Sequence, residues 1–199
     1  MGRSPRITEP GVVYHLLNRR VMRLPIFERD GDYAAFEGVL VEGLDRPDAP
    51  QLLAYCLMPN HWHLVVRATR GTNLSTWMQW MTVTHAHRWH AHRRTVGEGP
   101  LYQGRFRSFP VQEDVHFLIV CRYVEANAFR AGLVGRAEDW RWCSLWAWRM
   151  GGGGGRGGGE GGGGGEGGGV VWVAGSSPGR WTGRGTGWRT STVRWRRRR

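Results

Sequence analysis

Two histidines one residue apart interrupt an apolar stretch of the sequence, "YCLMPNHWHLVV" at residues 55–66. Alternate residues of a β-strand point to the same face, so His61 and His63 would project side by side while Trp62 faces the other way. Two imidazoles held like this can share one divalent metal ion. The spacing also fits an ordinary pair of surface histidines, and two ligands do not make a metal site, so a third ligand is needed.

A helix expected over residues 115–130 carries candidates for that ligand. His116, Val120, Tyr123 and Asn127 follow one another at intervals of four, three and four residues, which places them along one stripe of a helix. If the stripe faces the histidines, the side-chain oxygen of Asn127 could complete the site and the hydroxyl of Tyr123 could lie beside it. The same spacing fits a core tyrosine with a satisfied hydroxyl, and periodicity does not choose between the two.

The elements that must position these residues form a simple order along the chain. Short segments rich in β-branched and aromatic residues predict strands over 11–18, 51–58, 61–68 and 101–111. Apolar residues at helical spacing predict helices over 32–44, 72–94, 115–130 and about 138–148. Asp30 or Asp32 is available to cap the first helix, and Asp114 the third. This order suits an α+β sandwich of the ferredoxin-like sort, with one antiparallel or mixed sheet and helices packed on one face.

Six motifs occur in order between about residues 7 and 148: "YHLLNRR", "PIFERDGDYAAF", "YCLMPNHWHLVV", "YQGRFRSFPVQED", "CRYVEANAFRAGLV" and "EDWRWCSL". Together they resemble the REP-associated tyrosine transposases, single-tyrosine members of the HUH superfamily and relatives of insertion-sequence transposases that move DNA as single strands. Long ordered motifs are far more specific than a bare pair of histidines, and they favour the metal site. The resemblance implies a ferredoxin-like α+β sandwich with an antiparallel sheet, in agreement with the order of elements.

The resemblance also implies a role for each candidate residue. His61 and His63 match the metal ligands, Asn127 matches the polar residue that completes the site, and Tyr123 matches the catalytic tyrosine. The family cleaves single-stranded DNA beside a hairpin and forms a 5′-phosphotyrosine and a free 3′-hydroxyl. Two imidazoles and one amide suit Mg²⁺ or Mn²⁺, and we expect Mg²⁺ in the cell.

DNA contacts would come from other side chains. Arginine matches phosphate well, although exposed arginines are usually only solvated. One group of candidates belongs to family motifs and forms our predicted DNA-binding set: Arg19, Gln103, Arg105 and Arg107. Weaker candidates are further arginines for phosphates and two tryptophans for base stacking: Arg20, Arg88, Arg93, Arg94, Trp77 and Trp80.

The charge divides the chain into two parts. The net charge is +12, and all 28 basic residues are arginine. Residues 151–199 hold 9 of these arginines, 2 acidic residues and 21 of the 32 glycines, a composition that predicts a disordered tail. Residues 1–150 hold 19 arginines and 14 acidic residues and are predicted to form the HUH single-tyrosine transposase-like domain. A moderately basic domain favours a polyanionic partner.

We expect a cytoplasmic protein that acts on DNA, and its oligomeric state, monomer or homodimer, is not fixed by the sequence. No apolar run approaches the length of a membrane span, and three scattered cysteines form neither a disulfide framework nor a cysteine zinc site. Two other functions stay open from the residues: a non-catalytic module that binds single-stranded nucleic acid, and a zinc-binding structural protein. The histidine-rich segment over residues 84–94 is better explained as a polar helix face than as a metal site.

Overall fold

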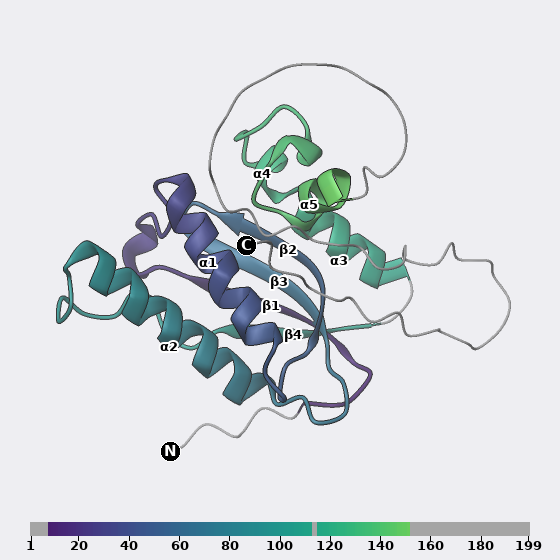
Figure 1. The fold of residues 1–199 in the computed structure, drawn as a ribbon. Coiled ribbons are helices and arrows are strands. Elements are labelled where there is room, and N and C mark those ends of the chain that lie inside the picture. The colour runs from purple at the N-terminus through teal and green to yellow at the C-terminus, as the bar shows by residue number, and fades with distance from the viewer. Residues whose placement is uncertain (1–7, 113–114, 152–199) are drawn as a thin grey trace, which may run out of the picture.

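A computed structural model describes residues 8–112 and 115–151. Its centre is a four-stranded sheet of β1 (Val13–Arg19), β2 (Gln51–Met58), β3 (His61–Arg67) and β4 (Arg107–Val111), in the order β2-β3-β1-β4 (Figure 1). Every pair of neighbouring strands is antiparallel. With α1 (Asp30–Leu44) and α2 (Leu74–Arg93), the order is β-α-β-β-α-β, so the predicted ferredoxin-like sandwich is confirmed.

One face of the sheet holds the main core. Strand alternation sends Leu16, Leu57, Trp62 and Leu64 to this face, where all four are fully buried. α1 and α2 lie side by side across it (Figure 1), and Trp77 of α2 donates a hydrogen bond of 2.7 Å to the Gly43 carbonyl of α1. Because α1 and α2 cover this face, an accessible functional site has to lie on the opposite face of the sheet.

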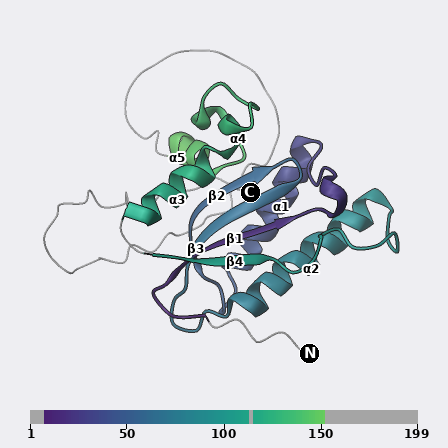
Figure 2. The same cartoon turned by 180° about the vertical axis from the view of Figure 1, so that it is seen from behind.

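The opposite face is partly covered by the C-terminal helices α3 (Val115–Glu125), α4 (Asn127–Arg130) and α5 (Ser144–Gly151), as the view from behind shows (Figure 2). Val124 and Ala128 from these helices pack against Cys56 and Val65 of the sheet. The prediction of helices on one face thus holds for α1 and α2, and α3 to α5 add a second, partial layer. Short 3-10 turns at Val21–Arg23 and Ala137–Asp139 complete the described elements.

Two helices differ from their predicted extents. The helix expected over 115–130 pauses at Ala126, whose ψ of 6° leaves the helical range, before α4 adds one more turn. The helix expected over 138–148 starts at Ser144, because the backbone before it pairs with the edge strand: Trp142 accepts a hydrogen bond of 2.8 Å from Leu57, and Cys143 bridges to Cys56. Open backbone on an edge strand competes with helix formation there.

The predicted caps have mixed outcomes. α1 begins at Asp30, and Asp32 lies inside its first turn, where its carboxylate accepts hydrogen bonds from the amides of Glu28 and Arg29. Asp114, the predicted cap of α3, lies outside the described residues, as does the tail from residue 152. Within the described ranges, no helix has the length and apolar character needed to cross a membrane.

Candidate active site

The sheet face opposite α1 and α2 carries the two histidines side by side, as predicted. His61 and His63 belong to β3, which is hydrogen-bonded to β1 on one side and β2 on the other. Their ring centroids are 4.9 Å apart and the ring planes cross at 82°. Two imidazoles on a central strand are thereby held close together by backbone pairing on both sides.

Trp62 anchors the same strand from the opposite face. Its side chain is fully buried, and its indole N–H donates a hydrogen bond of 3.1 Å to the hydroxyl of Tyr102. That hydroxyl lies 2.7 Å from Nδ1 of His85 on α2, which it can reach as a donor. These buried hydrogen bonds connect β3 to α2 and hold in place the strand from which the two histidines project.

Asn60, in the turn before β3, determines which ring nitrogen of His61 carries the proton. Asn60 donates through its side-chain N–H to the carbonyl of Arg23 at 3.1 Å, which fixes the orientation of its amide. The remaining oxygen, Oδ1, lies 2.6 Å from Nδ1 of His61 and can only accept, so Nδ1 carries the proton. A neutral His61 then has its lone pair on Nε2, where an ion can bind.

His63 has a partner that the sequence reasoning missed. Nδ1 of His63 lies 2.8 Å from Nε2 of His15, which projects from β1 on the same face. The two ring centroids are 5.0 Å apart with planes inclined by 24°, so the rings meet edge to edge across this hydrogen bond. Within the described part of the chain, Nε2 of His63 has no hydrogen-bond partner.

Burial keeps the imidazoles neutral. It lowers the pKa of His61 to about 4, and the positive charge of Arg19 adds to the effect. The pKa of His63 is lowered to about 3, first by burial and then by the neighbouring imidazoles and Arg19. Burial also lowers the pKa of His15. All three side chains are therefore uncharged near pH 7, the state that a metal-ligating histidine requires.

Tyr123 of α3 lies beside these rings. Its ring centroid is 6.2 Å from that of His63 and 6.5 Å from that of His15, with edge-on geometry in both cases. The side chain is 42% exposed, so it is not a core aromatic. The guanidinium of Arg130, at the end of α4, lies 5.0 Å from the Tyr123 ring centroid. A phenol, three imidazoles and one cation thus meet on one face of the sheet.

Asn127 begins α4 on the same side of the sheet. The next residue, Ala128, is fully buried in the same apolar cluster as Cys56, and Cys56 is paired with His63 in the β2·β3 ladder. α4 therefore sits over β2, one strand from the histidines. Nδ2 of Asn127 is buried and has no hydrogen-bond partner among the described residues.

These donors fit a divalent ion that takes mixed nitrogen and oxygen ligands. Both histidines of the pair have Nδ1 in a hydrogen bond, and neither Nε2 atom has a hydrogen-bond partner among the described residues. A buried amide with an unsatisfied N–H, as at Asn127, calls for an acceptor that the protein does not supply, such as a water or a phosphate oxygen. In the described ranges, no three His, Cys, Asp or Glu side chains form a metal-binding group, so the amide or non-protein oxygens would have to complete the coordination.

Known proteins identify the family to which this geometry belongs. The sequence matches the family described as "Transposase IS200 like" over residues 9–127, more than half of the chain. The chain belongs to the IS200-like transposase family. The predicted resemblance to tyrosine transposases is thereby confirmed.

Two solved structures are similar to the chain to different degrees, and the first of them has the same fold. The structure of the REP-associated tyrosine transposase bound to a REP hairpin shares 17% sequence identity with the chain, with a TM-score of 0.61, and covers 75% of this chain and 86% of that chain. A proposed transposase from Deinococcus radiodurans shares 19% identity with a TM-score of 0.44, covering 62% of this chain and 96% of that one. No curated protein sequence matches the chain.

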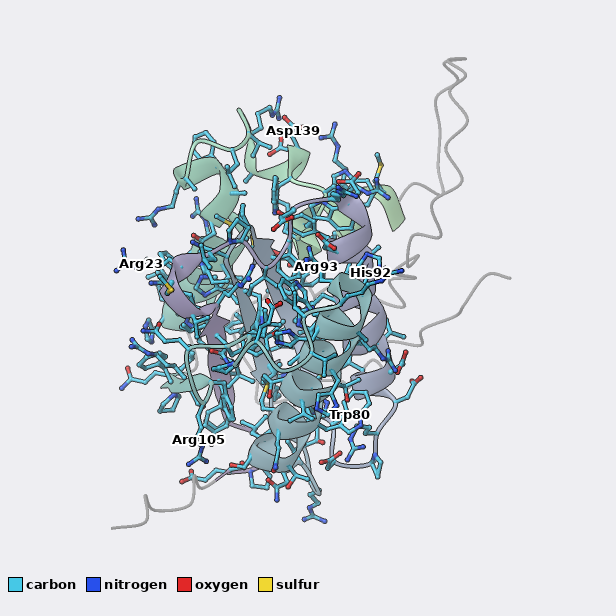
Figure 3. The ribbon with its side chains drawn as sticks, turned by 90° about the vertical axis from the view of Figure 1, so that its left-hand side faces the viewer. Arg23, Trp80, His92, Arg93, Arg105 and Asp139 are labelled. Atoms are coloured by element: carbon cyan, nitrogen blue, oxygen red, sulfur yellow. The ribbon has the colours of Figure 1, made fainter. Side chains whose placement is uncertain are left out.

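The transposase has a hollow of about 430 Å³ next to the histidines, and all four residues of the predicted DNA-binding set line it: Arg19, Gln103, Arg105 and Arg107. Arg19 faces His61 in the β1·β3 ladder, so the hollow borders the histidine pair. Figure 3 shows Arg105 at the edge of the molecule, separate from Arg93 and His92 of α2. Whether these residues contact DNA stays a prediction.

The hollow exists because the predicted strand over 101–111 is interrupted. β1 pairs with the later segment at Leu17↔Arg107 and again at Arg20↔Tyr102, so two residues of β1 face four residues of the other segment. The Asn18 side chain donates to the Gly104 carbonyl at 3.2 Å in place of a ladder bond. Two additional residues therefore bulge out of the sheet, a device often found beside functional sites.

Several weaker DNA-binding candidates have other partners in the transposase. Arg88 forms two hydrogen bonds with Glu42, at 2.8 and 2.9 Å, and Arg93 forms an ion pair of 2.8 Å with Asp32. Trp77 is fully buried in the core. The helix layer therefore uses these side chains for its own packing.

Three residues of the site escaped the sequence reasoning: His15, Asn60 and Arg130. His15 could have been found from strand alternation, since it shares the parity of Val13 and Leu17 on β1, but the pairing of β1 with β3 is not visible in sequence. Arg130 lies one helical turn past Asn127, within the predicted helix. The contact between Arg130 and the Tyr123 ring depends on the break in the helix at Ala126, which the sequence did not reveal.

Proposed function

We propose that this transposase cleaves and joins single-stranded DNA through a covalent bond to Tyr123, with a divalent ion held by His61, His63 and Asn127. The observation that supports this most directly is the half-exposed Tyr123 ring 6.2 Å from the ring of His63. A nucleophile must be both accessible and adjacent to the group that stabilises the transition state. Tyr123 is accessible and lies beside the proposed metal ligand His63, which supports this role.

The reaction replaces one ester by another. The phenol oxygen of Tyr123 forms a bond to phosphorus while the bond from phosphorus to the 3′ oxygen breaks. The phenol loses its proton and the leaving 3′ oxygen gains one, which yields a 5′-phosphotyrosine and a free 3′-hydroxyl. That hydroxyl can attack the phosphotyrosine of a second strand, because the bond energy is retained. When bound, Mg²⁺ or Mn²⁺ would polarise the scissile phosphate and stabilise the charge on its non-bridging oxygens.

The residues around the nucleophile have separate tasks. The neutral imidazoles of His61 and His63 offer lone pairs, and burial excludes the protons that would compete for them. Arg130, whose guanidinium lies over the Tyr123 ring, places a positive charge where a phosphate would approach. Arg19 links this region to the neighbouring hollow.

For the substrate, we infer single-stranded DNA next to a hairpin. Support comes from the solved transposase of similar fold, which was bound to a REP hairpin. The hollow lined by Arg19, Arg105 and Arg107 offers guanidinium groups to a phosphate backbone within reach of the histidine pair. We further expect a cytoplasmic protein that is a monomer or a homodimer, two states that light scattering of the purified protein distinguishes.

The decisive test is covalent trapping. The protein is incubated with a labelled hairpin oligonucleotide carrying single-stranded flanks, with and without Mn²⁺, and analysed in SDS. We expect a labelled adduct with Mn²⁺ that is absent in Tyr123→Phe and retained in Tyr14→Phe, a control tyrosine buried on the α1/α2 face. An adduct that persists in Tyr123→Phe would disprove the assignment of the nucleophile.

The hollow by itself also fits a second function, a non-catalytic module that binds single-stranded nucleic acid. Such a module binds through its arginines, so its affinity falls with salt and is insensitive to EDTA and to His61→Ala. Binding without any covalent adduct under the conditions above would favour this second function. A zinc-binding structural role would instead show bound zinc that disappears in the His61→Ala, His63→Ala double variant.

A further inference from the structure

His15 is a partly buried histidine beside the histidine pair, and the proposed reaction gives it no role. It lies on β1, half-buried between the ring of His63 at 5.0 Å, Phe109 at 6.3 Å and Tyr123 at 6.5 Å. Its Nε2 is hydrogen-bonded to Nδ1 of His63 at 2.8 Å. A neutral histidine placed nitrogen to nitrogen against a neutral histidine can be donor or acceptor, and the choice decides the chemistry of both rings.

Only one of the two proton arrangements leaves His63 able to bind an ion. In the first arrangement, Nε2 of His15 carries a proton and donates a hydrogen bond to Nδ1 of His63. The single ring N–H of neutral His63 is then at Nε2, and that atom cannot coordinate a metal ion. If Nδ1 of His63 carries the proton, Nε2 of His15 accepts it and Nε2 of His63 keeps a free lone pair. The His15 acceptor therefore decides whether the histidine pair has one available nitrogen or two.

We propose that His15 is a positioning residue whose Nε2 accepts a hydrogen bond from Nδ1–H of His63 and so presents Nε2 of His63 to the ion. This inference rests on the proposed function, because it assigns His63 as a ligand. His15 does not touch the ion or the substrate. It fixes the tautomer and the ring orientation of a residue that does, as partners of metal-ligating histidines commonly do.

The neighbouring histidine supports this assignment independently. Asn60 Oδ1 can only accept from Nδ1 of His61, so that ring already presents Nε2. With His15 as acceptor, both members of the pair have the same tautomer and the same nitrogen available. The nearly coplanar, edge-to-edge contact of His15 and His63 is the geometry that a directed N–H···N hydrogen bond requires.

The first test measures the affinity for Mn²⁺ by titration calorimetry, without DNA. His15→Phe keeps a ring of similar shape between Phe109 and Tyr123 but removes the acceptor, and we expect Mn²⁺ binding to weaken roughly 10–100-fold. His15→Gln offers a side-chain oxygen at a similar distance from the backbone and should restore most of the affinity. A purely structural role for His15 predicts the opposite order, with Phe retaining binding better than Gln.

The second test reads the proton directly in the metal-free wild-type protein. Long-range ¹⁵N–¹H correlation of the imidazoles should show His63 with its proton on Nδ1, and His15→Phe should shift His63 toward a mixture of tautomers. A wild-type His63 protonated on Nε2 would overturn the proposal, and this measurement needs no variant to fold.

The outcomes also separate this inference from the proposed function. If wild-type protein and His61→Ala show the same lack of Mn²⁺ binding, the metal-dependent function fails. If wild type binds Mn²⁺, His61→Ala does not, and His15→Phe binds like wild type, the proposed function stands and the role of His15 is refuted.

Discussion

Each imidazole of the histidine pair has one nitrogen occupied by a neighbouring side chain and one left free, and this division follows from residues that carry no charge. Asn60 occupies His61 and His15 occupies His63. Their effect is directional, because a hydrogen bond fixes both the tautomer and the plane of a ring. The orientation of both rings is thus fixed by residues of the protein itself.

At this scale, sequence reasoning identified the histidine pair and Tyr123 but missed the side chains that are hydrogen-bonded to the histidines. His61, His63 and Tyr123 were identifiable from their spacing and family motifs, and the structure brings Tyr123 next to His63. Their catalytic roles stay predictions. Strand alternation gives the face of β1 on which His15 lies, but its contact with His63 depends on which strands are adjacent, a long-range property that local patterns do not contain.

A second buried group at the residue scale leads to a prediction about stability. Burial raises the pKa of Glu37 from an ordinary 4.5 to about 7, against the opposing effects of the Tyr55 hydroxyl at 2.9 Å and of Arg141. Because the pKa of Glu37 is higher in the folded protein than in the unfolded chain, the stabilising contribution of Glu37 is complete below about pH 4.5 and is lost as the pH rises to about 7. The loss amounts to about 3 kcal/mol.

Glu37→Gln should remove this pH dependence while keeping an acceptor for Tyr55. We expect urea unfolding at pH 5 and pH 8 to show a large fall in the wild type and a much smaller one in the variant, which should be the more stable protein at pH 8. Glu98→Gln, at an exposed position, serves as the control and should follow the wild type. Equal pH profiles for Glu37→Gln and wild type would contradict the assignment.

At the scale of elements, the contact between α1 and α2 is tightest at a glycine. A Cβ at Gly43 would lie 2.5 Å from Sδ of Met81, whereas a Cβ at Gly38 of the same helix would meet nothing within 4 Å. Gly38→Ala should therefore stabilise the protein by roughly 0.5–1 kcal/mol through helix propensity. Gly43→Ala should destabilise it by about 1–3 kcal/mol, because Met81 is buried and has to move.

Chemical denaturation of the two glycine variants measures this difference. Both substitutions change helix propensity alike, so the gap between their free energies of unfolding reports the packing of α2 against α1. Equal stabilities would mean that the helices separate easily at this point.

The elements also show where prediction from sequence ends. Strand β3 was predicted at its observed start, because its apolar run and its turn at Pro59-Asn60 are local signals. The strand over 101–111 was predicted too long, because its alternation continues through residues 101–106 while the Asn18 side chain takes over the hydrogen bond at Gly104. A side chain from a distant strand decided that boundary.

For the whole molecule, charge placement predicts the salt dependence of DNA binding. Arg105 and Arg107 are exposed and line the hollow beside the histidine pair, whereas Arg88 is ion-paired with Glu42 on the opposite helix layer. Replacing both Arg105 and Arg107 by Gln should weaken binding to a hairpin with a single-stranded flank. It should also reduce the slope of log affinity against log salt concentration by roughly 1–1.5, because fewer phosphate contacts mean that fewer counterions are released on binding.

Fluorescence anisotropy at several NaCl concentrations measures this slope. Arg88→Gln removes one positive charge as well and should leave the slope close to that of the wild type. If Arg88→Gln and the double variant changed the slope in proportion to charge alone, binding would depend on net charge and the hollow would have no special part in it.

The hollow depends on the number of residues between Tyr102 and Arg107 more than on their identity. Four residues span a stretch where an uninterrupted ladder has space for two. We therefore expect that shortening this segment by two residues would allow continuous strand pairing. The hollow would then disappear even though every arginine of the neighbouring strands is still present. A change in the length of this segment would then remove the hollow, whereas a substitution within it would change only the lining.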